Sequence, residues 1–142
     1  MKLSAYNNAL KLLTHRDYGE SELVQRLLQK GHDADEIQQA FKRLRELKYL
    51  DDQRSATALY LYSVKRGYGS KRVRQTMQLR GYDAVVIDDV FAEQDTPWLA
   101  LAEAARCKRF GEEKPRQHKD KAKQQRFLYQ RGFDADIIYD LF

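Results

Sequence analysis

The chain has 142 residues, of which 26 are Lys or Arg and 21 are Asp or Glu, so its formal net charge is +5. Hydrophobic residues make up 42% of the chain, enough for one domain or a short array of small units, each with a modest core. There is no apolar run long enough for a membrane span, and the one cysteine, Cys107, excludes an internal disulfide framework and predicts a reducing, cytoplasmic location.

The first segment predicts three helices. Leu3–Leu13 is rich in small and apolar residues, and a second stretch follows Tyr18-Gly19 with an apolar side made by Leu23, Val24, Leu27 and Leu28. This stretch ends at Gly31, a residue suited to the left-handed position that closes a helix. Asp33 then predicts the cap of the third helix, and Glu36 has capping-box spacing to it.

The same order returns about fifty residues later. A helix is predicted over Ala56–Val64, with Asp51 or Asp52 as its cap. Tyr68-Gly69 precedes a second helix with Val73 and Met77 on its apolar side. That helix ends at Gly81, and Asp83 predicts the cap of the next one.

The third segment follows the same plan with one insertion. Thr96-Pro97 predicts the cap and first residue of a helix over Trp98–Ala105. We expect Arg109-Phe110-Gly111 to take the place of the Tyr-Gly pair, with the connection lengthened near residues 112–120. Gly132 and Asp134 then close the last helical corner.

These segments are copies of one repeat. The pattern G-x-D-A-x-x-I-x-x-x-F occurs without a gap at residues 31–41, 81–91 and 132–142. Its Ile and Phe stand four apart, on one face of a helix. No window alternates apolar and polar residues, so no strand is expected. The sequence predicts an all-α fold of three tandem three-helix repeats, 1–50, 51–94 and 95–142, stacked into an elongated, curved body.

The chemistry of the sequence argues against catalysis. His15, His32 and His118 are isolated and lack metal-ligand spacing to Cys107, and we interpret them as surface or helix-end residues. Adjacent acids such as Asp51-Asp52 do not face each other on a helix, and no nucleophile–base pair is visible. We therefore predict a non-enzyme with no catalytic residue, no metal and no cofactor.

Charge is distributed unevenly and predicts an anionic partner. No acidic residue lies between Asp52 and Asp83, whereas basic and tyrosine residues are frequent there. Tyr60 is expected in the core. The candidate partner or nucleic-acid surface consists of Arg54, Lys65, Arg66, Tyr68, Lys71, Arg72, Arg74 and Arg80, extended by Lys119, Lys121 and Lys123. Such cations neutralise phosphates, and aromatic rings stack on unpaired bases. A solvated helix face and an acidic protein groove remain alternatives.

Two segments of the middle repeat carry a resemblance. Residues 49–56, Tyr-Leu-Asp-Asp-Gln-Arg-Ser-Ala, and residues 65–69, Lys-Arg-Gly-Tyr-Gly, resemble signatures of the RecX family, bacterial regulators of the recombinase RecA. Residues 125–133 are similar to the last repeat of that family. Ser55 stands where the family pattern more often has an aromatic residue, so we expect a weaker hydrophobic contact there.

The resemblance implies a non-catalytic regulator, and we expect the chain to be a monomer. Family members bind RecA filaments on single-stranded DNA and inhibit the recombinase, ATPase and co-protease activities of RecA in DNA repair and the SOS response. Single-stranded DNA would be contacted directly or through RecA. Two other hypotheses stay open: a stand-alone DNA-binding protein of helix-turn-helix type, and a purely structural helical scaffold.

Overall fold

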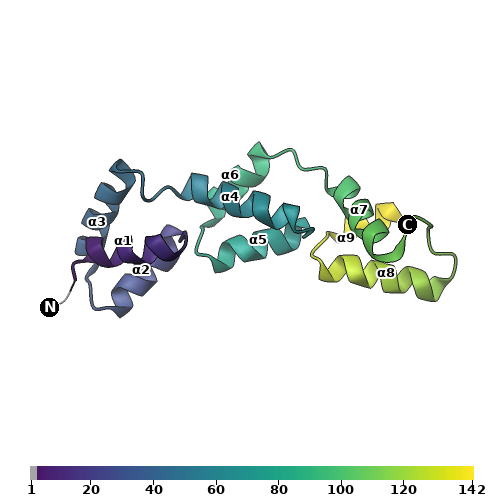
Figure 1. The fold of residues 1–142 in the computed structure, drawn as a ribbon, viewed down its shortest axis with the longest axis horizontal. Coiled ribbons are helices and arrows are strands. Elements are labelled where there is room, and N and C mark those ends of the chain that lie inside the picture. Colours follow the sequence, from purple (N-terminus) through teal and green to yellow (C-terminus); the bar gives the residue numbers. More distant parts are fainter. Residues whose placement is uncertain (1–2) are drawn as a thin grey trace. The chain divides into compact units, whose positions relative to one another are not determined.

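The computed structural model describes residues 3–142, and in this range it contains nine helices and no strand (Figure 1). The all-α prediction is therefore confirmed, and the helices follow one another in three sets of three. The helices are α1 (Ala5–His15), α2 (Glu20–Gln29), α3 (Ala34–Glu46), α4 (Asp52–Lys65), α5 (Ser70–Leu79), α6 (Ala84–Glu93), α7 (Trp98–Phe110), α8 (His118–Gln130) and α9 (Ala135–Leu141).

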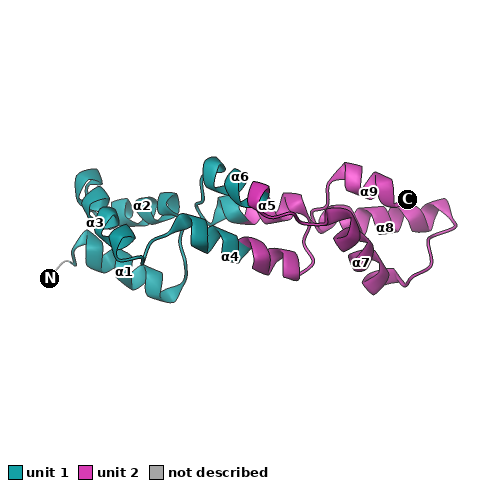
Figure 2. Ribbon diagram, turned by 90° about the horizontal axis from the view of Figure 1, so that it is seen from above, with its two compact units in different colours: residues 1–59, 77–91 teal, residues 60–76, 92–142 magenta. Residues whose placement is uncertain are grey.

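The chain divides into two compact units rather than at the repeat boundaries (Figure 2). Unit 1 holds residues 1–59 and 77–91, and unit 2 holds residues 60–76 and 92–142. The division passes through α4 and α5, so the middle repeat contributes residues to both units. The repeat boundaries that the sequence suggests at residues 50 and 94 stay predictions.

The core of unit 1 is built on the first repeat, where α1, α2 and α3 pack on one another. Ile37 and Phe41 lie on one face of α3 as predicted, and both are fully buried. Leu23 and Leu27 of α2 are also buried, but Leu28 is 48% exposed, so the predicted apolar side of α2 is narrower than expected. Burying these side chains is the main stabilising contribution of the repeat.

The core of unit 2 is built on the third repeat, where α7, α8 and α9 pack on one another. Ala102, Leu128 and Phe133 are fully buried there. Tyr60, at the point where α4 enters this unit, is only 1% exposed, which confirms the expectation that it is a core residue. Its hydroxyl lies 2.6 Å from the hydroxyl of Thr96.

The helical corners follow the repeated motif closely. Gly31, Gly81 and Gly132 have φ angles of 92°, 85° and 94°, the left-handed conformation that glycine adopts without a steric cost. Asp33 and Asp83 cap the next helices, because their carboxylates accept hydrogen bonds from Glu36 N and Val86 N at 2.8 and 3.1 Å.

Two of the capping contacts predicted at the repeated motif are wrong. Asp134 occupies the N-cap position of α9 but makes no side-chain capping bond. Glu36 does not complete a capping box. Its Oε1 instead accepts a 2.9 Å hydrogen bond from Ala5 N and lies 3.1 Å from Nδ1 of the buried His32. The carboxylate of Glu36 therefore satisfies the first N–H group of another helix, α1.

The paired acids before α4 have different roles. Asp51 is the cap, since its Oδ1 accepts from Arg54 N at 3.1 Å. Asp52 is the first helical residue, and both of its carboxylate oxygens lie 3.2 Å from Glu20 N at the start of α2. Burial raises the pKa of Asp52 from an ordinary value of 3.8 to about 6.

The third repeat departs from the predictions at the start and end of α7. Pro97 is the N-cap residue rather than the first helical residue, and Thr96 provides no side-chain cap. The helix continues past Ala105 to Phe110 and ends at Gly111. A Cβ atom on Gly111 would meet nothing within 4 Å, so this segment does not take the place of the Tyr-Gly pair.

A fully buried arginine holds the long connection between α7 and α8. The guanidinium of Arg106 donates to the carboxylate of Glu103 and to the carbonyl oxygens of Gly111, Glu112 and Glu113. The Arg106 hydrogen bond lowers the pKa of Glu103 to about 2. This network fixes the segment that the sequence marks only as an insertion.

Candidate functional site

A backbone joint positions the central residues of the candidate site. Gly69 N donates to Arg131 O and Lys71 N donates to Gly132 O, both at 2.9 Å. A Cβ atom on Gly69 would lie 2.3 Å from Phe133 N, so only glycine allows this approach. The start of α5 and the α8–α9 corner are therefore held in direct contact within unit 2.

Tyr68, next to this joint, gathers three guanidinium groups around its ring. The Cζ atoms of Arg72, Arg131 and Arg66 lie 4.1, 5.1 and 5.9 Å from the ring centroid. Cation–π attraction holds these groups near the ring although they repel one another. We call Arg66, Tyr68, Arg72 and Arg131 the Tyr68 cluster.

Further contacts fix the edges of the Tyr68 cluster. Arg66 Nη1 donates to the Tyr62 hydroxyl at 3.0 Å, and Arg131 Nη2 donates to Arg66 O at 3.3 Å. Lys71 Nζ lies 5.9 Å from the ring centroid of Tyr129 and 4.0 Å from Asp134 Oδ1. Tyr129 is 62% exposed, so its ring is an accessible aromatic surface beside this cation.

The other predicted residues fall into two groups. Lys65 is exposed at the end of α4, and the half-buried Arg74 lies on α5; both are in unit 2 with the Tyr68 cluster. Arg54 and Arg80 belong to unit 1, where Arg54 Nη2 donates to Lys48 O at 3.0 Å and Arg80 O accepts from Gly19 N at 3.0 Å. These two residues thus belong to a different compact unit from the Tyr68 cluster.

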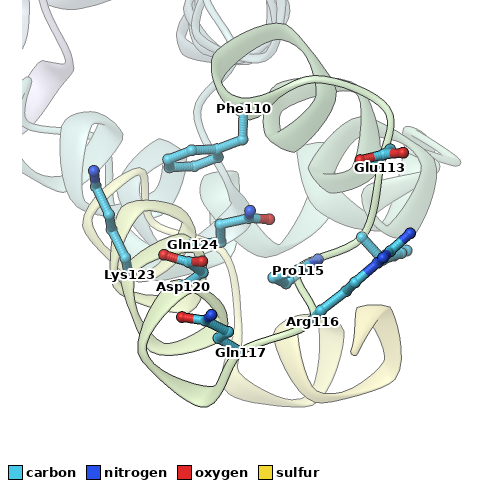
Figure 3. Close-up of a pocket in the computed structure, with 9 residues that line it drawn as sticks. Phe110, Glu113, Pro115, Arg116, Gln117, Asp120, Lys123 and Gln124 are labelled. Carbon is cyan, nitrogen blue, oxygen red and sulfur yellow. The ribbon is translucent and has the colours of Figure 1, made fainter.

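The predicted lysines of α8 do not form one surface. Lys119 and Lys123 are four residues apart and exposed, whereas Lys121 is half-buried on another face of the helix. Lys123 lines a hollow of about 420 Å³. Figure 3 shows it together with Asp120 and Gln124 of the same helix and Phe110 from the end of α7. Because Asp120 and Glu113 also line this hollow, its charge is mixed.

The comparisons with known proteins assign the family. Two family models match the chain: the first three-helix domain of RecX over residues 5–44 and the third three-helix domain over residues 98–142. The chain is 37% identical over 96% of its length to "Regulatory protein RecX" of Vibrio vulnificus strain CMCP6, and the match covers 89% of that protein. The chain belongs to the RecX family.

Other RecX proteins and solved structures agree. The chain is 34% identical to "Regulatory protein RecX" of Legionella pneumophila strain Corby, with 97% of this chain and 92% of that one covered. The crystal structure of RecX from Lactobacillus salivarius matches with a TM-score of 0.78 at 19% identity, over 96% of this chain and 90% of that one. The tandem three-helix fold is thus that of RecX structures, and the family's name describes regulators, in agreement with the predicted non-enzyme.

At Ser55 the departure from the RecX pattern has a local explanation. Ser55 is buried, and its Oγ accepts a 2.7 Å hydrogen bond from the hydroxyl of the buried Tyr82. The position therefore carries a polar contact within unit 1, where the resemblance led us to expect a weakened hydrophobic contact. Burial raises the pKa of Tyr82, so this hydroxyl keeps its proton at neutral pH.

Sequence reasoning missed Arg131 in this RecX chain. Arg131 directly precedes Gly132 of the repeated motif, and this position indicates only a helix end. It is indeed the C-cap residue of α8. Its side chain, however, reaches Tyr68, more than sixty residues earlier in the chain. Lys108 and Arg109 were missed as well, and they line a hollow with Lys65, Arg66 and Arg131.

Two kinds of feature are absent from residues 3–142. Within residues 3–142, no group of three His, Cys, Asp or Glu side chains is placed to hold a metal ion. In the same range, no helix combines the length and the apolar character needed to cross a bilayer.

Proposed function

We propose that this RecX-family chain binds, as a monomer, to RecA filaments assembled on single-stranded DNA. It inhibits the recombinase, ATPase and co-protease activities of RecA, and so modulates DNA repair and the SOS response. Membership of a family of regulatory proteins supports the general role. The observation that carries the proposal is the Tyr68 cluster, in which Arg66, Arg72 and Arg131 surround one aromatic ring.

The chemistry of the Tyr68 cluster suits a nucleoprotein partner. A guanidinium that lies over an aromatic ring keeps its N–H edge available for oxygen acceptors, and guanidinium groups recognise phosphates and carboxylates with paired hydrogen bonds. Tyr62 and Tyr129, both exposed, provide aromatic rings near these cations that could stack on unpaired bases. Several such contacts along one polymer bind strongly together even when each is weak.

The helix-turn-helix alternative receives less support from the third helices of the middle and last repeats. In a helix-turn-helix module the helix after the corner enters the major groove and must tolerate phosphate charge. That helix is α6 in the middle repeat and α9 in the last one. Neither contains a Lys or Arg, whereas α6 carries Asp88 and Asp89 and α9 carries Asp136 and Asp140. Such helices would be repelled by duplex DNA.

The proposal is tested by charge reversal in the RecA ATPase assay on single-stranded DNA. We expect the triple variant K65E/K71E/R72E to need roughly tenfold more protein for half-maximal inhibition than the wild type, because phosphate or carboxylate contacts become repulsive. The matched control is K11E/K30E/K42E, which changes the charge equally at three exposed lysines of the first repeat. The control should inhibit like the wild type.

Two results would contradict the proposal. One is a wild-type protein that leaves the ATPase activity unchanged at equimolar RecA. The other is sequence-specific binding to duplex DNA without RecA, which would favour the helix-turn-helix alternative. Equal inhibition by the wild type and by K65E/K71E/R72E would remove the Tyr68 side of unit 2 from the interface.

A further inference from the structure

A second hollow in unit 2 is lined by five cations, which we call its rim, and by five apolar residues, which we call its floor. Its volume is about 510 Å³, and its walls come from the end of α4, from α7, from α8 and from the corner after α8. The rim cations are Lys65, Arg66, Lys108, Arg109 and Arg131. The apolar residues are Val64, Leu101, Ala104, Ala105 and Phe127. Gly67 completes the lining, so no Asp or Glu contributes to it.

The rim charge is not neutralised by the chain itself. Among residues 3–142, none of the five rim cations forms an ion pair with a carboxylate. Five unpaired cations around one hollow repel one another and attract anionic groups, and the apolar side chains beside them strengthen this field because they have a low dielectric constant.

The floor selects an aliphatic or aromatic side chain rather than a nucleobase. Four of its five residues are aliphatic, so they provide no flat ring on which a base could stack. The fifth, Phe127, already packs edge to face against Phe110 with ring centroids 5.4 Å apart. The guanidinium groups of Arg131 and Arg109 lie 5.8 and 5.9 Å from its centroid. A base would have to displace these partners, whereas an apolar side chain needs only to cover the floor.

We propose that this hollow binds a short acidic segment of a partner protein. One apolar side chain of the segment enters the hollow, and the carboxylates on either side of it pair with the rim cations. The inference rests on the proposed function, because it assigns the segment to the protein component of the filament rather than to the DNA. It adds a protein-recognition site to the nucleoprotein surface around Tyr68.

The test uses the full chain and defined probes. The first probe is a fluorescent heptapeptide with six acidic residues around a central phenylalanine; the second has serine at the centre, and the third is a short oligo-thymidine. Binding is measured by fluorescence anisotropy at low salt. The variant A104W fills the hollow from an exposed position on α7 without changing any charge, and A58W, at an exposed position on α4 outside the hollow, is the matched control.

We expect the phenylalanine peptide to bind roughly tenfold or more tightly than the serine peptide, since only the former buries an apolar group. A104W should remove that advantage, A58W should keep it, and both should bind oligo-thymidine like the wild type. Amide chemical shifts of Leu101, Ala105 and Phe127 in the wild type should move on titration with the phenylalanine peptide. This second measurement does not depend on the folding of a variant.

Three results would overturn the inference. The first is equal affinity of the wild type for the two peptides, and the second is an A104W protein that binds the phenylalanine peptide like the wild type. The third is an A104W protein that loses as much affinity for oligo-thymidine as for the phenylalanine peptide. The last would assign the hollow to nucleic acid. These outcomes are separate from the RecA ATPase assay. If the wild type and A104W inhibit RecA equally, the inference alone is contradicted. If the wild type does not inhibit RecA, the proposed function is contradicted.

Discussion

At the scale of single residues, two acidic side chains cap helices other than their own. Glu36 of α3 accepts from Ala5 N of α1, and Asp52 of α4 accepts from Glu20 N of α2. Gly19, the N-cap residue of α2, has no side chain to do this, so Asp52 satisfies an N–H group that would otherwise lack a partner. These contacts connect helices by hydrogen bonds where the small repeats have little core to bury.

Asp52 predicts an unusual pH dependence of stability. Its carboxyl group has a pKa of about 6 in the folded chain, mainly because it is partly buried, and an ordinary value near 3.8 when unfolded. The folded state therefore binds more protons than the unfolded state between these values, and this group makes the free energy of unfolding fall as pH rises from about 4 to 6. The variant D52N keeps an oxygen that can accept from Glu20 N and does not titrate. As pH rises from about 4 to 6, the free energy of unfolding of D52N should therefore increase relative to that of the wild type.

Urea denaturation of both proteins at several pH values from 4 to 7 measures this difference. The control is D51N, which changes the neighbouring acid that caps α4 from an exposed position. The free energy of unfolding of D51N should not increase relative to that of the wild type as pH rises from 4 to 6. A difference between D52N and the wild type that is constant from pH 4 to 7 would show that Asp52 ionises normally.

At the scale of helices, glycine contacts join one set of helices to the next. Gly19 N donates to Arg80 O in unit 1 just as Gly69 N donates to Arg131 O in unit 2, at 3.0 and 2.9 Å. A Cβ atom on Gly19 would lie 2.3 Å from Gly81 C, which repeats the restriction found at Gly69. The Tyr-Gly pair and the motif glycine are thus two halves of one joint, and this explains why both recur.

The variant G69A is expected to lower the free energy of unfolding by about 2–3 kcal/mol, because its Cβ would overlap backbone atoms that cannot move aside as a flexible side chain can. The matched control is S70A, which changes the next residue without adding a Cβ atom and should stay within about 0.5 kcal/mol of the wild type. Thermal and urea denaturation measure both. Equal free energies of unfolding for G69A and the wild type would mean that the backbone around Gly69 leaves room for a Cβ atom, contrary to the distances given above.

At the scale of the whole molecule, an excess of positive charge combines with repeated architecture. The net charge is +5, and the stretch from residue 53 to residue 82 contains no acid. In unit 2 the cations of this stretch meet others from α7 and α8 around Tyr68 and the neighbouring hollow. Binding to a polyanionic partner through such cations releases counterions and depends on ionic strength.

Salt dependence therefore provides a measurement on the complete protein. The logarithm of the concentration needed for half-maximal inhibition of the RecA ATPase should rise linearly with the logarithm of salt concentration. The slope should be shallower for K65E/K71E/R72E, because fewer ionic contacts remain to be broken. RecA alone, assayed at each salt concentration, corrects for the effect of salt on the filament. Parallel slopes for the two proteins would place these cations outside the interface.

The sequence by itself determined the helices, the glycine corners, three of the four predicted aspartate caps and the family. All of these depend on residues close together in the chain, where helix capping and left-handed glycine conformations have strong local preferences. The same local reasoning assigned Arg131 to a helix end and Glu36 to a capping box. Those assignments used the correct chemistry, but they considered only neighbours in sequence.

The tertiary structure alone decided which groups meet across thirty or more residues. It placed Arg131 on Tyr68, Glu36 on Ala5 and Asp52 on Glu20, and it assigned Arg54 and Arg80 to unit 1 and the Tyr68 cluster to unit 2. It also buried Arg106 against three loop carbonyls. Such contacts follow from how helices pack and from the close approach that glycine allows, and a single sequence carries no local signal for either.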